Sequence, residues 1–96
     1  MGTSRFLKTP TLSIVLQLTE VASNDGRTWE VHDIERNRGF RVNLPKTTQA
    51  KIADDAIDKA LGFAIERALV TPPEKVAGPL YDVTITPEDV KAAGEA

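Results

Sequence analysis

Large aliphatic side chains alternate with mostly polar ones between residues 11 and 22, and this pattern constrains the fold more than any other feature. Leu12, Ile14, Leu16 and Leu18 occupy every second position. A period of two places such residues on one face of a β-strand. Because the opposite face is largely polar, the pattern predicts an antiparallel sheet that is covered on one side only.

Two turn signals divide the chain after this first strand. Residues 23–26 read Ser-Asn-Asp-Gly and residues 36–39 read Arg-Asn-Arg-Gly. Both sequences are typical of tight turns between strands. A second strand is therefore predicted over residues 28–34 and a third over residues 40–44, where apolar and polar residues again alternate.

The second predicted strand contains an irregularity. Trp29 and Val31 are in phase with each other, whereas Ile34 is out of phase with them. Either a bulge near Asp33 restores the alternation, or the strand ends at that point.

A long helix is predicted over residues 48–70, a stretch without proline that Thr47 or Thr48 can cap. Small and aliphatic residues recur along it at helical spacing. The face that they form would pack on the sheet or on a second copy of the same helix. Gly62 lies on the polar side, where the pattern offers no reason for a glycine. The residues of the apolar face are Ala53, Ala56, Ile57, Ala60, Leu61, Ala64 and Ala68.

The C-terminal part of the chain predicts one more strand and a short helix. Proline residues at positions 72 and 73 end the long helix. Thr86 is suited to the N-cap of the short helix, and Pro87 to its first position. The helix can continue to about residue 93. The residues that indicate the fourth strand are Leu80, Tyr81, Val83 and Ile85.

These elements define an α+β fold in a single small domain, with the order β-β-β-α-β. The first three strands form an antiparallel meander, the long helix packs on one sheet face, and a short C-terminal helix follows. Residues 1–10 are expected to be a flexible N-terminal tail, and residues 11–93 to be the domain. A right-handed crossover would place the fourth strand parallel to the first and beside it.

The composition excludes several classes of function. The chain has 96 residues and no cysteine, which excludes disulfides, a thiol nucleophile and thiolate metal sites. Its net charge of −2 disfavours general nucleic-acid binding, which needs a basic surplus. We see no signal peptide and no apolar run long enough to span a membrane, so we expect a cytoplasmic protein without membrane contact.

No group of residues predicts catalysis. His32 is the only histidine, and we interpret it as a solvated strand residue. Asp33 and Glu35 beside it are interpreted as ordinary surface acids that do not complete a metal site. The acidic residues at positions 54, 55 and 58 are interpreted as a solvated helix face. There is no nucleophile elbow and no glycine-rich phosphate loop. We therefore expect no enzyme activity and no cofactor; the alternative is an enzyme whose dispersed active site is built across a dimer.

Five basic residues within a short stretch form the candidate partner-binding patch. They surround the first two turns and the third strand, and such a patch could receive phosphate or an acidic protein surface. The alternative is that they form cross-strand ion pairs with the acids among them. The candidate residues are Arg27, Arg36, Arg38, Arg41 and Lys46.

The sequence thus favours a small, non-catalytic binding, adaptor or inhibitor-like protein that acts through protein–protein contacts. The alternative is a self-assembling structural subunit, a homodimer or a larger homo-oligomer, with paired edge strands or helices. Nucleic-acid binding is disfavoured, because the aromatic residues are in phase with the core and leave no exposed platform for stacking bases. Those aromatic residues are Trp29, Phe40, Phe63 and Tyr81.

Overall fold

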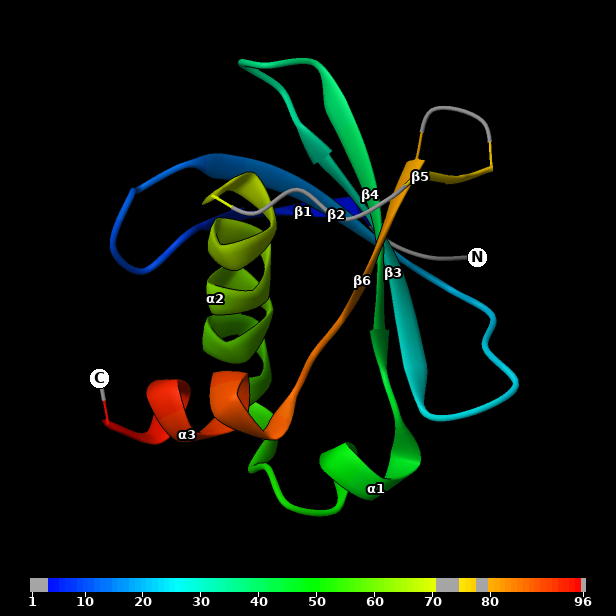
Figure 1. The fold of residues 1–96 in the computed structure, drawn as a ribbon, viewed down its shortest axis with the longest axis vertical. Coiled ribbons are helices and arrows are strands. Elements are labelled where there is room, and N and C mark those ends of the chain that lie inside the picture. The colour runs from blue at the N-terminus through cyan, green and yellow to red at the C-terminus, as the bar shows by residue number, and fades with distance from the viewer. Residues whose placement is uncertain (1–3, 71–74, 78–79, 96) are drawn as a thin grey trace.

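A computed structural model describes residues 4–70, 75–77 and 80–95 as a single α+β domain with one mixed sheet, and the two longer helices lie on one side of it (Figure 1). The strands are β1 (Ser4–Lys8), β2 (Val15–Val21), β3 (Arg27–Asp33), β4 (Arg38–Leu44), β5 (Lys75–Ala77) and β6 (Leu80–Thr84). The helices are α1 (Lys46–Gln49), the 3-10 turn η1 (Asp54–Ala56), α2 (Ile57–Val70) and α3 (Pro87–Glu95). None of the described helices is long and apolar enough to cross a membrane.

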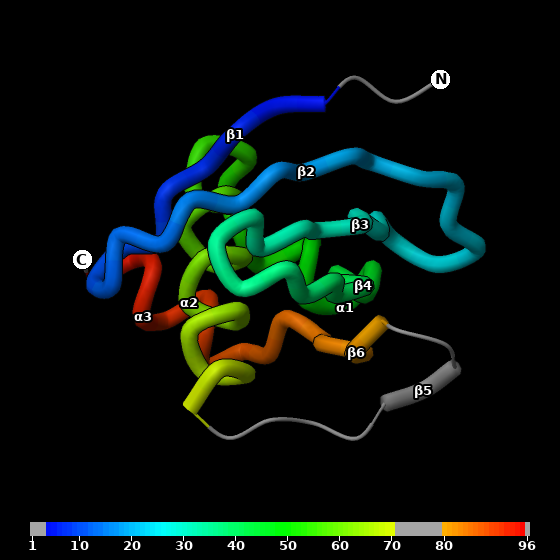
Figure 2. Tube along the Cα trace, turned by 90° about the horizontal axis from the view of Figure 1, so that it is seen from above, coloured from blue at the N-terminus to red at the C-terminus, as the bar shows by residue number. Residues whose placement is uncertain are grey.

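The sheet has six strands in the order β1-β2-β3-β4-β6-β5. Figure 2 shows β1, β2, β3, β4 and β6 following one another down the picture. All neighbours are antiparallel except β4 and β6, which are parallel. The antiparallel meander predicted from the sequence is confirmed as β2, β3 and β4.

The position predicted for the fourth strand is wrong. It is β6, and it lies parallel to β4, with Val42 opposite Val83, rather than beside β2. The edge of β2 that the prediction assigned to it is occupied by β1. The chain therefore leaves β4, passes through α2 over one face of the sheet, and places β6 beside β4, with β5 outside it.

The flexible tail predicted over residues 1–10 is also wrong for Ser4–Lys8, which form β1. This strand pairs along its whole length with β2, with Phe6 opposite Gln17. Leu7 packs against the core, and Arg5 donates hydrogen bonds to the carboxylate of Asp58 on α2. The strand has no clear alternation of its own, because Arg5 occupies an inward-facing position and Phe6 an outward-facing one.

Two details of the predicted strands change at their ends. Strand β2 begins only at Val15, and Leu12 lies 54% exposed in the preceding turn. Ser13 has a φ of 54° there, a left-handed conformation that interrupts the strand. Strand β3 ends at Asp33. Ile34 is therefore out of phase because the strand ends before it, not because of a bulge.

The helix predicted over residues 48–70 is interrupted. After α1, Ala53 adopts an extended conformation with φ −73° and ψ 146°, and η1 leads into α2. Ala53 is exposed, in contrast to the prediction, because the stripe that faces the sheet begins only at Ile57. The alanines of α2 are used against the sheet, since Ala60 and Ala64 are fully buried in the core. That packing removes the helix–helix alternative for this face.

The core lies between α2 and the covered face of the sheet. Trp29 and Phe40 are its largest fully buried side chains, as their phase predicted, and the Phe40 ring lies 5.8 Å from that of Tyr81. The remaining core residues are Ile14, Leu16, Leu18, Val31, Val42, Leu44, Ile57, Ala60, Leu61, Ala64, Ile65, Ala68, Val83, Ile85 and Ala93.

Gly62 has a structural reason that its place on the helical wheel did not reveal. It is buried where α2 meets the turn between β1 and β2. A Cβ at this position would lie 2.7 Å from Pro10 Cδ and 3.4 Å from the Cα of Thr9. Both atoms belong to the backbone or to a rigid ring, so the turn can approach α2 this closely only because the residue is glycine.

We expect Gly62→Ala to lower the free energy of unfolding by about 1 kcal/mol. Overpacking costs about 1–3 kcal/mol, and the better helix propensity of alanine recovers about 0.8–1 kcal/mol of this. The matched control is Gly94→Ala in α3, where a Cβ meets nothing within 4 Å, and this variant should be as stable as the wild type or slightly more so. Urea unfolding of the three proteins measures both effects, and a Gly62→Ala protein more stable than the wild type would contradict the close approach.

Candidate binding surface

The structure does not bring the five basic residues together into one patch. Arg27 lies opposite Leu44 at one end of β4, while Arg38 lies at the other end, about 20 Å away at about 3.3 Å per residue. Arg38 and Arg41 are three positions apart on the same strand, so they face opposite sides of the sheet. Lys46 is exposed on α1. These residues therefore serve different parts of the surface.

Two of the basic residues are tied to neighbouring carboxylates. Arg27 donates two hydrogen bonds to Glu20, at 2.8 and 2.7 Å, and its guanidinium lies 4.8 Å from the centre of the Trp29 ring. The hydrogen bonds with Glu20 raise the pKa of Arg27 and lower that of Glu20. Arg36 forms an ion pair with Asp33 at 3.3 Å. The alternative of cross-strand ion pairs describes Arg27 with Glu20, whereas Arg36 pairs with Asp33 within one turn.

Arg41 is the member of the group that lies on the uncovered face of the sheet. It stands opposite Glu30 in the register of β3 and β4. The two side chains form an ion pair at 3.7 Å and are 52% and 49% exposed. This distance is longer than a hydrogen bond, so the guanidinium keeps donors that can reach a partner.

A polar hollow of about 630 Å³ surrounds this ion pair. The loop after β2 forms its wall, and the uncovered face of β3 and β4 forms its floor. The Thr28 hydroxyl lies 3.0 Å from Ser23 Oγ and 3.1 Å from Asn43 Oδ1, and Asn43 donates a 2.8 Å hydrogen bond to Asp82. The hollow is lined by Val21, Ala22, Ser23, Asn24, Asp25, Thr28, Glu30, Arg41, Asn43 and Pro45.

A second, smaller hollow of about 230 Å³ continues along the same face and shares Glu30 with the first. His32 lines it and is exposed, in agreement with its interpretation as a solvated strand residue. The Leu80 side chain packs directly over Gly39 here, where a Cβ would lie 2.6 Å from Leu80 Cδ2. We call the two hollows and the ion pair between them the open-face groove.

The acidic residues form no candidate metal centre within the described part of the chain, where no three histidine, cysteine, aspartate or glutamate side chains converge. Asp58 is engaged by Arg5. The interpretation of Asp33 as an ordinary surface acid is wrong, because its side chain is fully buried. It accepts hydrogen bonds from the backbone N–H and the guanidinium of Arg36, at 3.2 and 3.3 Å, and closes the turn after β3.

Glu66 is a buried carboxylate that the sequence pattern missed. It is 7% exposed and accepts hydrogen bonds from the backbone N–H groups of Thr11 (2.9 Å) and Leu12 (2.6 Å) and from the Thr11 hydroxyl (2.6 Å). Burial by itself raises the pKa of Glu66, but these hydrogen bonds outweigh it and hold the pKa below its usual value. Gly62, one helical turn earlier, was the signal that this side of α2 faces another segment.

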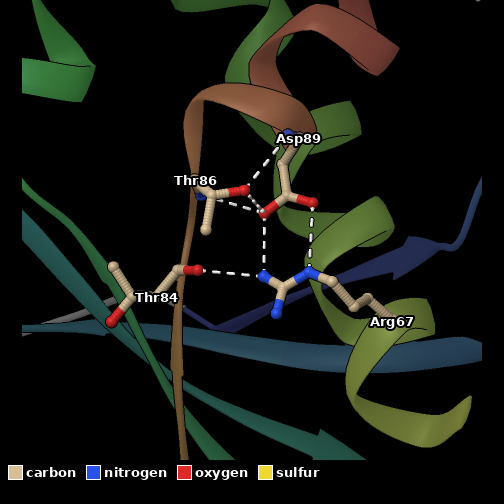
Figure 3. Close-up of polar contacts among 4 residues, drawn as sticks. All are labelled: Arg67, Thr84, Thr86 and Asp89. Atoms are coloured by element: carbon tan, nitrogen blue, oxygen red, sulfur yellow. Dashed lines mark hydrogen bonds and ion pairs between the residues drawn. The ribbon is translucent and has the colours of Figure 1, made fainter. Parts of the chain in front are cut away.

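Arg67 and Asp89 join α2 to the start of α3 (Figure 3). The Arg67 guanidinium donates to Asp89 at 2.9 Å and to the carbonyl of Thr84 at 3.0 Å. The Thr86 N–H donates to Asp89 at 2.9 Å, and the Asp89 N–H donates back to the Thr86 hydroxyl at 3.4 Å. This reciprocal pair is a capping box, and it confirms Thr86 as the N-cap of a helix that begins at Pro87.

An apolar groove of about 410 Å³ lies on the outer side of α2. Leu12 and Val70 are exposed apolar residues that line it, at 54% and 77% exposure, and the half-buried Phe63 lines it as well. Glu66 and Arg67 also border it, but both are engaged in the internal contacts described above.

Comparison of the chain with protein-family models, with curated proteins and with solved structures found no match. Functional interpretation therefore depends on the surfaces themselves.

We expect Glu66→Gln to destabilise the protein at neutral pH by about 1–3 kcal/mol, because one oxygen that accepts a hydrogen bond becomes an NH₂ group facing a donor. A carboxylate whose folded-state pKa is lowered contributes stability above its unfolded pKa of about 4.3, and the contribution is lost as pH falls through the folded value. The difference in free energy of unfolding between wild type and variant should therefore have its full size at neutral pH and become smaller below about pH 4.

Urea unfolding at neutral pH and at about pH 3 measures this difference. The matched control is Glu95→Gln at the exposed end of α3, which should leave stability unchanged at both values. A Glu66→Gln deficit that is the same at both pH values would contradict the role of the charge.

Proposed function

We propose that this protein is a non-catalytic binding module that recognises another protein in the cytoplasm through the open-face groove. The observation that carries the proposal is the polar, concave surface around the Glu30–Arg41 pair, on a sheet whose other face is covered by helices. A surface of this kind is solvated on its own and becomes dry only when a partner covers it.

The buried ionisable groups support binding rather than catalysis. Glu66, Asp33 and Asp89 each hold a turn or a helix end through hydrogen bonds with groups of this chain. No buried side-chain nitrogen or oxygen in the described residues is left without a hydrogen-bond partner. Catalytic groups, in contrast, keep capacity directed at a substrate.

The chemistry of the groove indicates the kind of partner. The guanidinium of Arg41 suits a carboxylate, which it can bind through two parallel hydrogen bonds. Glu30 and Asp82 flank it on the neighbouring strands, so the partner is expected to carry a basic group beside its carboxylate. A volume of about 630 Å³ is large enough to receive several side chains of such a protein surface.

The test is affinity capture from a lysate of the source organism with wild type, Arg41→Gln and Lys91→Gln as immobilised baits. Lys91 is exposed on α3, away from the groove, and its substitution removes the same charge. Truncating one member of a charged contact across an interface costs about 2–5 kcal/mol, so Arg41→Gln should bind the captured protein about 30-fold more weakly or worse.

The control variant should bind like the wild type. Equal retention of the captured protein by all three baits would contradict the proposal, as would equal loss in both variants or the absence of any protein captured by the wild type.

A further inference from the structure

We propose that two copies of the chain pair through β1, antiparallel across a two-fold axis, and join their sheets into one. The inference goes beyond partner binding at the open-face groove, because it concerns a different part of the sheet. It depends on the position of β1 at the edge, its charge, its register with itself and the exposure of Phe6.

Strand β1 is an exposed edge of a kind that proteins usually protect. It stands at one end of the strand order and, among the residues that the structure describes, pairs only with β2. Its five residues, Ser4–Lys8, contain no proline and keep an unbroken register. The opposite edge, β5, has only three residues and a shifted register. An unpaired edge as regular as β1 is a template for another strand.

The charge on β1 does little to guard this edge. Charged side chains often protect edge strands from pairing. Here the guanidinium of Arg5 is bound to the carboxylate of Asp58 on α2, and the hydrogen bond with Asp58 raises the pKa of Arg5. The guanidinium is therefore paired on the covered side of the sheet, and Lys8 at the end of the strand is the other cation of β1.

The sequence of β1 is compatible with itself in one full-length register. In an antiparallel pair across a two-fold axis, one residue of the strand stands opposite its own copy, and the axis passes between the two. With the axis at Phe6, this residue faces the partner's Phe6, Arg5 faces the partner's Leu7, and Ser4 faces the partner's Lys8. No like charges stand opposite each other in this register, whereas a shift of the axis to Arg5 would place two arginines face to face.

Phe6 gives the pairing its apolar contact. It is 64% exposed on the uncovered face, and Val15, at 37%, lies diagonal to it on β2. Aromatic residues directly opposite each other across antiparallel strands stabilise the pair. The contact is small, so we expect a dimer that dissociates on dilution. It leaves Arg41 accessible, because β4 lies three strands away from β1.

Sedimentation velocity over a wide range of protein concentration tests the proposal on the whole chain. We expect a monomer–dimer equilibrium for the wild type and a monomer for Phe6→Glu. The matched control is Val70→Glu, which places the same charge at another exposed apolar site, at the end of α2 and 77% exposed, and should still form the dimer. A wild type that stays monomeric throughout, or a Phe6→Glu protein that associates like the wild type, would overturn the proposal.

Disulfide formation between introduced cysteines tests the register separately. Because the chain has no cysteine of its own, an introduced cysteine can pair only with another introduced cysteine. We expect a mixture of Ser4→Cys and Lys8→Cys chains to form a disulfide-linked heterodimer much faster than either variant alone forms a homodimer. Equal rates in the mixture and in the separate variants would overturn the proposed register. Because Phe6→Glu leaves the groove intact, it should still capture the partner of the open-face groove, so the two proposals fail separately.

Discussion

The one-sided coverage of the sheet depends on how α2 is held at both of its flanks. On one flank, Gly62 admits the turn between β1 and β2, and Glu66 accepts three hydrogen bonds from that turn. On the other flank, Arg67 joins the end of β6 to the capping box of α3. Neighbouring residues on a single helix thus connect segments from opposite ends of the chain. These contacts place the alanine-rich stripe of α2 against the sheet and exclude water from the core.

The functional surfaces follow from this arrangement. Because α2 and α3 are committed to one face, the other face of β3 and β4 stays open, and the loop after β2 turns it into a groove. Because the turn at residues 9–14 is anchored to α2, β1 is brought beside β2 and becomes the edge of the sheet. The proposed partner contact and the proposed self-pairing therefore use different parts of one sheet, and both depend on the same helix.

Local patterns predicted those parts of the fold whose causes are local. Alternation located β2, β3 and β4, and the sequence Thr-Pro-Glu-Asp located the start of α3. Contacts between residues far apart in the sequence determined the rest. Arg5 of β1 binds Asp58 of α2, and Gly62 of α2 lies against Pro10 in the turn after β1. The candidate site was likewise predictable only where local patterns determine it. The facing of Arg41 follows from strand period, whereas the separation of the five basic residues depends on which strand ends lie together.

The position of α2 against the turn between β1 and β2 can be measured directly in solution by nuclear Overhauser spectroscopy. We expect strong cross-peaks between the Hα protons of Gly62 and the Hδ protons of Pro10, because no side chain separates the helix from the proline ring. If these cross-peaks are absent while Pro10 shows contacts to other segments, α2 is not held where we place it. The one-sided coverage of the sheet, and both surfaces that depend on it, would then be contradicted.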